Sequence, residues 1–324
     1  MDNVSIFKKY YTNEPFIDRY AKDKEGAVDV IIPVIHSTEI WEENLKSIYR
    51  EIPVNRLLIS DGGCKDNSID IVKKFPRVFI LDHKKFVTLG FCLRKLIEAV
   101  ETEWFIYLHS DVYLPKDWFN VMKKYQPQYD WFGCPQRITA MVEYHNVDKI
   151  YDELRPYAGS QMGRREAFIK GLEKIDDDFV YRQEDLIFAS LVENNGFKHG
   201  RIEDTFHYHQ LMHKESPWSR KLTRVIVEAE WSRQERIRSS MMQLKGIVKY
   251  LTPTKSLNKV LRLEIINLIS LDEFNGEEFK CWVEKTNPSW LPYVDHKKIH
   301  FSILLRKIYH KCKELFWGLV RMSK

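Results

Sequence analysis

An acid at the end of a hydrophobic run is the first residue of this chain that could do chemistry. The run from Trp104 to Leu108 is apolar and aromatic, which favours a strand covered on both faces, and Asp111 follows it closely. Ligands of open α/β sheets bind at the carboxyl ends of the strands. A carboxylate there could hold a divalent cation, and taken alone it could equally be a capping aspartate in a loop.

Two adjacent acids, Glu184 and Asp185, precede a helical pattern that Gly196 would end. A carboxylate near an acceptor hydroxyl can remove its proton as the oxygen attacks. Acids at the amino end of a helix also satisfy its free N–H groups, so helix capping is the alternative role.

A glycine turn follows the short strand pattern at 56–60, and two aspartates lie in it. Asp61 could accept hydrogen bonds from a base N–H such as that of uracil, while Gly62 lets the chain bend around the ligand. Asp66 could hold a ribose or orient the loop. The alternatives are a turn aspartate for Asp61 and a helix N-cap for Asp66.

Histidines 207 and 209 alternate along a segment that reads as extended, so both side chains should point to the same side. Such a pair suits metal ligation or contact with a diphosphate. His209 is the first choice, His207 the second, and His213 a third. Partly exposed surface histidines are the alternative.

Alternating strand and helix patterns position these groups. Strand patterns at 28–35, 56–60, 77–81 and 104–108 are separated by helical patterns at 39–49, 69–75 and 88–100. This order predicts an α/β fold whose mainly parallel sheet has helices on both faces. The 324 residues, 44% of them hydrophobic, are enough for a core and one large or two modest domains.

Composition and charge narrow the class of protein. Five scattered cysteines without a CxxC pair indicate neither a zinc site nor a disulfide framework, and no run approaches the roughly 18 apolar residues of a spanning helix. We therefore expect a cytoplasmic protein. Residues 214–324 carry 22 Lys and Arg against 12 Asp and Glu, so the charge is concentrated in one part of the chain.

The carboxyl-terminal region reads as helical, with apolar stripes at 221–250 and 257–271. Residues 299–322 place apolar and aromatic residues on one side and basic residues on the other, which is typical of a helix at a membrane surface. Packing on its own domain or on a second subunit is the alternative. Nucleic-acid binding is disfavoured, because the aromatics follow a helical stripe and not a cationic groove.

In this order, the motifs resemble those of the family 2 glycosyltransferases. Val30-Ile-Ile-Pro33-Val34 is similar to the family's first strand, and the segment 60–68 resembles its D-G-G-S-x-D turn with Cys64 in place of serine. Gly90 to Arg94 lies where the family has a glycine-led helix with a basic residue. His109-Ser110-Asp111 falls on the D-x-D motif, with His109 in place of the first acid, and Glu184-Asp185 on the E-D motif.

The resemblance implies a GT-A fold, Rossmann-like with a mainly parallel sheet. It divides the chain into a leader at 1–27, a nucleotide-binding half at 28–114, an acceptor half at 115–213 and a basic helical region at 214–324. It also implies inverting transfer of a sugar from a nucleoside-diphosphate sugar, UDP first among the nucleotides, to a hydroxyl of a glycan, lipid-linked or other acceptor.

Site residues follow from the resemblance as well. Asp185 is the expected catalytic base, with Glu184 as the fallback base or a partner that positions the acceptor. Manganese or magnesium would be held by Asp111 with His209 or His207, and His109 could bond the ribose or ligate manganese. The residues expected to contact the donor are Pro33, Val34, Asp61, Gly62, Asp66, Arg94, His109, Ser110, Asp111, Gly159 and Ser160.

Two other functions stay open. The histidine at 109 favours a catalytically weak or inactive homologue that binds nucleotide sugars. A sugar nucleotidyltransferase would share the sheet, but it should carry a glycine-rich basic loop near the first strand, and Val34 to Thr38 is not one. The sugar and the acceptor depend on loops such as 136–160 and on the helical region.

Overall fold

The computed structural model describes residues 15–35, 37, 41–81, 88–144, 147–155, 159–173, 175, 179–209 and 232–294, with the backbone alone at 138–144, 147–155 and 270. The chain divides into two compact units, Met1–Trp231 and Ser232–Lys324. The leader, the two halves and the start of the helical region at 214 stay predictions.

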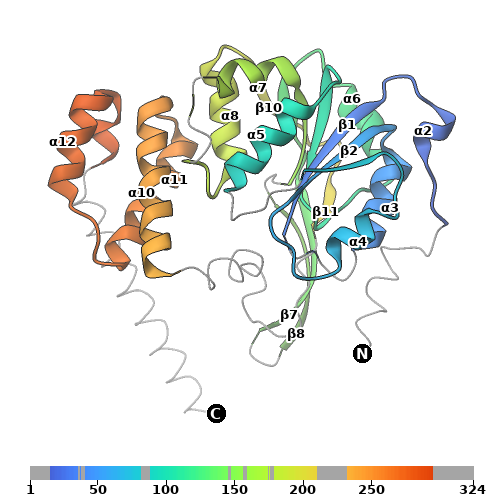
Figure 1. Ribbon diagram of the computed structural model, residues 1–324, viewed down its shortest axis with the longest axis horizontal. Helices are drawn as coiled ribbons and strands as arrows, with labels where there is room; N and C mark the ends of the chain where they lie inside the picture. The colour runs from blue at the N-terminus through green and yellow to red at the C-terminus, as the bar shows by residue number, and fades with distance from the viewer. Residues whose placement is uncertain are drawn as a thin grey trace. The chain divides into compact units, whose positions relative to one another are not determined.

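A seven-stranded mixed sheet forms the centre of the first unit (Figure 1). Its order is β10-β6-β9-β4-β1-β2-β3, and within it only β9 runs against the others. The mainly parallel α/β fold predicted from the sequence is therefore confirmed. The strands are β1 Val28–Val34, β2 Val54–Asp61, β3 Val78–Leu81, β4 Trp104–Leu108, β6 Trp131–Gly133, β9 Ser160–Arg164 and β10 His199–Arg201.

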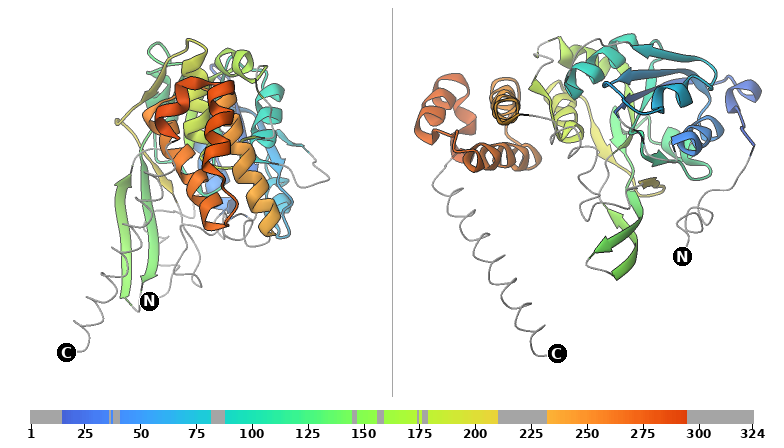
Figure 2. Two further views of the ribbon diagram at one scale, coloured as in Figure 1. Left: turned by 90° about the vertical axis from the view of Figure 1, so that its left-hand side faces the viewer. Right: turned by 60° about the horizontal axis from the view of Figure 1, so that its bottom comes forward.

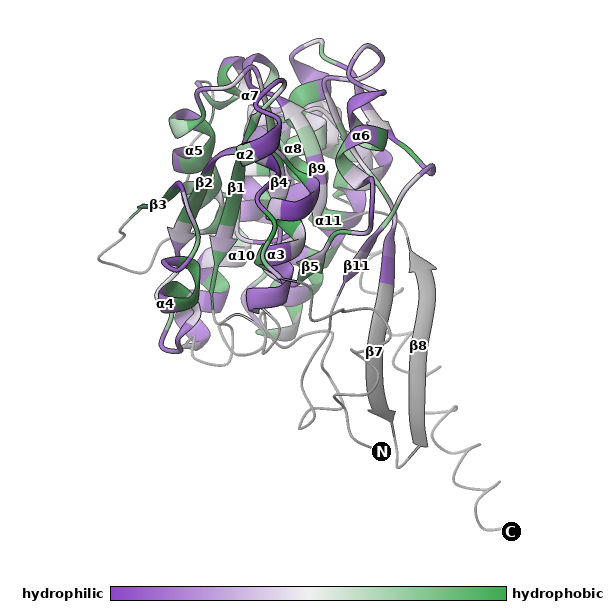
Figure 3. Cartoon of the chain, turned by 90° about the vertical axis from the view of Figure 1, so that its right-hand side faces the viewer, coloured by the Kyte–Doolittle hydropathy of each residue, from purple (hydrophilic) through white to green (hydrophobic). Residues whose placement is uncertain are grey.

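Helices cover both faces of this sheet because successive side chains of a strand point to opposite sides. In β1, Val30 and Ile32 pack in the cluster that contains Trp41 of α3, whereas Ile31 lies with Leu93 of α5. In Figure 3, β1 and β2 are mostly hydrophobic, and helices α3 and α5 contain hydrophilic residues as well. The helices are α2 Arg19–Lys22, α3 Trp41–Glu51, α4 Ser68–Val72, α5 Leu89–Ala99, α6 Trp118–Lys123, α7 Arg165–Leu172 and α8 Glu184–Asn194.

A second sheet carries part of the site. It has the order β5-β11-β7-β8, where β5 is Val112–Tyr113, β11 His207–His209, β7 Gln136–Tyr144 and β8 Val147–Arg155. Most of the range 136–160, which we expected to be loops, is thus a hairpin in which β7 and β8 pair antiparallel. Residues with high strand propensity explain the difference, namely Ile138, Thr139, Val142, Tyr144, Val147, Ile150 and Tyr151.

The second unit is helical where it is described, as predicted (Figure 2). It contains α10 Arg233–Tyr250, α11 Lys255–Ser270, α12 Gly276–Thr286 and a 3-10 helix, Pro288–Tyr293. Ser232 and Glu235 form a capping box at the start of α10. Residues 221–231 and the predicted membrane-surface helix at 299–322 lie outside the described residues. Among the described helices, none has the length and apolar character needed to cross a membrane.

Candidate active site

The site begins where three parallel strands end. Val34 of β1 is paired with Asp61 of β2, and β4 leads directly into His109, so these residues share one edge of the sheet. The N–H of Gly62 donates to the Val34 carbonyl at 2.8 Å, which continues the pairing of β1 and β2 past Asp61. The predicted donor residues Pro33, Val34, Asp61, Gly62, His109, Ser110 and Asp111 lie at or directly after this edge.

The loop after β4 is held from two sides. The His109 N–H donates to the Gly159 carbonyl at 2.9 Å, and the buried Asn44 amide donates to the Ser110 carbonyl at 2.8 Å. Gly159 has φ +89°, and a Cβ there would lie 2.9 Å from His109 Nδ1. Only glycine tolerates both conditions without strain. Ser160 follows at the start of β9, opposite Leu108.

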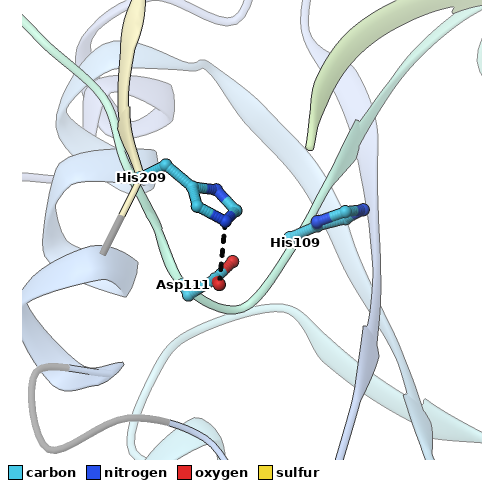
Figure 4. A group of neighbouring side chains, drawn as sticks. All are labelled: His109, Asp111 and His209. Atoms are coloured by element: carbon cyan, nitrogen blue, oxygen red, sulfur yellow. Dashed lines mark ion pairs between the residues drawn. The ribbon is translucent and has the colours of Figure 1, made fainter. Parts of the chain in front are cut away.

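An acid and a histidine meet beside this loop. Asp111 Oδ2 lies 3.3 Å from His209 Nε2 (Figure 4), because β5 and β11 pair Val112 with His209. Among the described residues, Asp111 Oδ1 and His209 Nδ1 are buried without a hydrogen-bond partner. Burial lowers the pKa of His209 although Asp111 acts against this. A neutral imidazole beside a carboxylate is a donor set that can bind a metal.

His109 completes a group of three possible metal ligands. One ligand atom each from His109, Asp111 and His209 lies within 4.8 Å of the others. Figure 4 shows His109 and His209 on opposite sides of Asp111. The unpartnered Asp111 oxygen fits a divalent cation at this place.

His207 has a different environment from His209. It is fully buried, and its Nδ1 lies 2.6 Å from the Ser160 hydroxyl, while its Nε2 has no partner among the described residues. Burial lowers its pKa well below the usual range. It is not in the described ligand groups, so its role as a metal ligand stays a prediction. His213 lies outside the described residues.

The two predicted catalytic acids are buried at the start of α8. Gln183 adopts φ 56° and turns the chain into the helix, leaving Glu184 7% and Asp185 9% exposed. Glu184 Oε1 lies 2.9 Å from His109 Nε2, and it accepts a hydrogen bond from the Tyr107 hydroxyl at 3.0 Å. His109 therefore lies between the two acids, Glu184 and Asp185, and the pair formed by Asp111 and His209.

The surroundings separate the two acids chemically. Burial and the neighbouring Glu184 raise the pKa of Asp185 to about 7. Burial acts on Glu184 in the same direction, but the hydrogen bond and the charge of His109, together with a backbone hydrogen bond and the Tyr107 hydroxyl, outweigh burial and lower the pKa of Glu184. Burial disfavours the charge on His109, yet the bond with Glu184 raises the pKa of His109 to about 9. Asp185 is thus suited to exchange a proton near neutral pH.

Apolar side chains account for the burial of Asp185. Its carboxyl group borders a small cavity, and Asp185 Oδ1 has no partner among the described residues. A carboxylate in such a place is poorly solvated, which favours its neutral form. The cavity is lined by Ile31, Leu93, Ile97, Phe105, Tyr107, Trp131, Phe168, Asp185 and Phe188.

Three further predicted residues have local partners. Asp61 Oδ1 accepts from the N–H groups of Gly63 and Cys64 at 2.9 and 2.8 Å, and Asp66 Oδ1 accepts from the Ser68 N–H at 3.1 Å. These are the turn and helix-start roles named as alternatives. Arg94 donates to Glu98 and to the Ile175 carbonyl, both at 2.9 Å. Their contacts with a donor stay predictions.

Two residues escaped the sequence analysis, Tyr107 and Gln161. They are paired across β4 and β9, and both are buried. Tyr107 lies two positions before His109, so the alternation of a strand puts both side chains on one face. Gln161 leaves both amide atoms without a partner among the described residues. The signal that could have identified these two residues in the sequence is a polar side chain within a strand that is otherwise buried.

The sheet and its flanking helices have the GT-A fold. Residues 29–187 match the family model described as glycosyl transferase family 2. The matched segment runs from β1 to the start of α8 and includes Asp111, Glu184 and Asp185. Residues 29–187 therefore carry a glycosyl transferase family 2 domain.

Two solved structures of TarS have a fold similar to that of this chain. Residues 1-349 of S. aureus TarS in complex with UDP are 13% identical, with a TM-score of 0.51 and coverage of 88% of this chain and 91% of that one. The UDP-GlcNAc complex of the same TarS segment is 15% identical, with a TM-score of 0.50 and coverage of 82% and 79%. The chain spans half of the bifunctional IspDF from Campylobacter jejuni, 50% of that chain against 55% of this one, at 12% identity and a TM-score of 0.39. A comparison with curated protein sequences gave no match.

Proposed function

We propose that the protein is an inverting glycosyltransferase that moves a sugar from a nucleoside-diphosphate sugar to a hydroxyl group. The observation that carries this proposal is the meeting of two groups around His109. Asp185, a buried acid with a pKa of about 7, lies on one side, and the Asp111–His209 pair lies on the other. One side suits removal of a proton and the other suits a phosphate-bound cation.

The reaction is a single displacement. Ionised Asp185 accepts the proton of the acceptor hydroxyl as its oxygen attacks the anomeric carbon, and the bond from that carbon to the diphosphate breaks. One displacement at one carbon inverts its configuration. Burial of the site keeps water away, which strengthens the electrostatic interactions of Asp185 and Glu184 with the reacting groups.

Asp111 and His209 would hold a divalent cation. When bound there, the cation would neutralise charge on the departing diphosphate. Manganese suits a mixed nitrogen and oxygen set better than magnesium, which prefers oxygen ligands. Because Nε2 of His109 already contacts Glu184, we propose first that His109 is a neighbour of the cation, and only second that it is a ligand.

A uridine nucleotide is the first donor to test. Asp61 lies at the end of β2, where its carboxylate could accept from a base N–H, and the two TarS structures are complexes with UDP and UDP-GlcNAc.

The acceptor we propose is a glycan or a lipid-linked glycan, which would place the enzyme in polysaccharide biosynthesis. We propose that the sugar lies beside the loop 109–111, which Gly159 approaches closely because it has no Cβ.

The basic region suggests where the enzyme works. We propose a cytoplasmic enzyme, peripheral at the inner membrane face through residues 299–324, with self-association as the alternative use of that stripe. Anionic liposomes should sediment the full chain and should fail to sediment a chain that ends at residue 298. Equal sedimentation of both chains would refute the membrane role.

The experiment that tests the function begins with the donor. A panel of nucleotide sugars is screened by thermal shift with and without Mn²⁺, and the stabilising donors are then assayed for release of the nucleoside diphosphate with glycan acceptors. Release that Asp185→Ala abolishes supports the proposal. Calorimetric donor binding without release under any condition would instead favour the inactive homologue that the histidine at 109 suggests.

A further inference from the structure

Tyr107 is a buried hydroxyl group with a specific partner. It lies in β4 with 3% of its surface exposed, and its ring is stacked with Trp131 at 6.3 Å between centroids. A hydroxyl in such surroundings is stable only when it is hydrogen-bonded, because leaving it unpaired costs more than the bond itself contributes.

The partners of Tyr107 form a closed triangle. The Tyr107 hydroxyl donates to Glu184 Oε1 at 3.0 Å, and His109 Nε2 lies 2.9 Å from that same carboxylate oxygen and 2.9 Å from the hydroxyl oxygen. One oxygen of Glu184 therefore faces two donors, one from β4 and one from the residue that follows Leu108. Hydrogen bonds to a charged group are stronger than neutral ones, so this contact restrains the carboxylate.

The restraint separates Glu184 from its neighbour. Asp185 follows it at the first turn of α8 and has Oδ1 free of partners among the described residues. Two adjacent carboxylates with equal freedom would share one proton and exchange roles. Here Glu184 is bonded to Tyr107 and His109, whereas Asp185 borders an apolar cavity and has Gln161 and the Gly159 backbone as its polar neighbours.

We propose that Tyr107 is a positioning residue of the transfer reaction, which with His109 holds Glu184 in place so that Asp185 alone takes the acceptor proton. The inference rests on the proposed function of Asp185 as the base. Tyr107 touches neither donor nor acceptor, and it acts through Glu184.

The test is a double-mutant cycle in the full chain, with Tyr107→Phe, Glu184→Ala and the double variant, assayed for nucleotide release. Tyr107→Phe should lower kcat about tenfold, the effect of one hydrogen bond to a buried charge, and should leave KM for the donor unchanged. In the Glu184→Ala background the same change should cost nothing further.

The matched control is Tyr49→Phe. Tyr49 is also fully buried and also loses one hydroxyl hydrogen bond, to the Pro76 carbonyl, but it lies outside the site. It should keep wild-type kcat. Urea unfolding of the four proteins in the cycle adds a second readout, in which the midpoint shifts of Tyr107→Phe and Glu184→Ala should be non-additive.

Two results would overturn the inference while leaving the proposed function intact. One is an equal loss of kcat from Tyr107→Phe in both backgrounds, and the other is wild-type kcat in Tyr107→Phe, whatever the unfolding midpoints are. Absence of transfer by the wild-type enzyme with every donor would instead refute the proposed function, and this inference would fall with it.

Discussion

Glu184 Oε1 and His109 Nε2 lie 2.9 Å apart, although 75 positions separate the two residues in the chain. His109 occupies the position where the family pattern has an acid. The histidine attracts the Glu184 carboxylate, whereas an acid at position 109 would repel it. His109→Asp should therefore destabilise the fold by about 2–4 kcal/mol, since it leaves two carboxylates in contact in a buried site. Urea unfolding at pH 8 measures the change.

A compensating variant controls that prediction. His109→Asp combined with Glu184→Gln removes the second charge and should recover most of the lost stability. If the double variant is no more stable than His109→Asp alone, the contact between residues 109 and 184 is not the cause.

Asp185→Asn should lower kcat by about 10²–10⁴-fold, the range expected for loss of a general base. Donor affinity measured by calorimetry should stay at the wild-type value, because Asp185 serves the acceptor. Glu193→Gln is the control, since Glu193 is a carboxylate on the same helix with 47% of its side chain exposed. Nearly unchanged transfer by Asp185→Asn would assign the base elsewhere, with Glu184 the next candidate.

The pH dependence of kcat should follow the ionisation of Asp185. The pKa of this acid is about 7, and only the ionised form accepts a proton, so kcat should rise with pH and level off above 7. Below the pKa the rate should fall about tenfold per pH unit. Because Glu184 raises the pKa of Asp185, Glu184→Gln should move this limb to lower pH. A profile that is flat from pH 5.5 to 8 would contradict the prediction.

Asp111→Asn should weaken Mn²⁺ binding by at least about tenfold, because the carboxylate is the charged member of the ligand set. Electron paramagnetic resonance of free Mn²⁺ during titration, in the presence of UDP, measures the affinity without reference to activity. His209→Ala should act in the same direction. Asp70→Asn, with 78% of its side chain exposed on α4, is the control. Equal Mn²⁺ affinity of the wild type and the three variants would show that the metal does not bind at Asp111 and His209.

Gly159→Ala should lose about 1–3 kcal/mol of folding stability through its positive φ, and also most of the activity, because its Cβ would lie 2.9 Å from His109 Nδ1. Gly196→Ala separates the two effects. Gly196 has φ +82° with open space around it, so that variant should lose stability and keep kcat. Comparable kcat in both variants would show that the approach to His109 is not needed for transfer.

Much of the donor side of the site could be predicted from the sequence by itself. The strands β1, β2 and β4 appear in the sequence as runs of apolar residues, either alternating with polar ones or continuous. Because parallel strands end at one edge of a sheet, Val34, Asp61 and Asp111 had to lie near one another at that edge. The glycines of the turn and the alternation of His207 and His209 are local properties as well. They depend on neighbouring residues, which the sequence displays directly.

The roles within the site were decided by the tertiary structure. The sequence offers Glu184 and Asp185 as equal neighbours, and only the tertiary structure brings Tyr107 of β4 and the following His109 into contact with Glu184. Likewise His207 and His209 share one side of β11, but packing gives the first to Ser160 and the second to Asp111. A pKa or a ligand position depends on burial and on atoms brought within about 4 Å from distant segments, which no local pattern records.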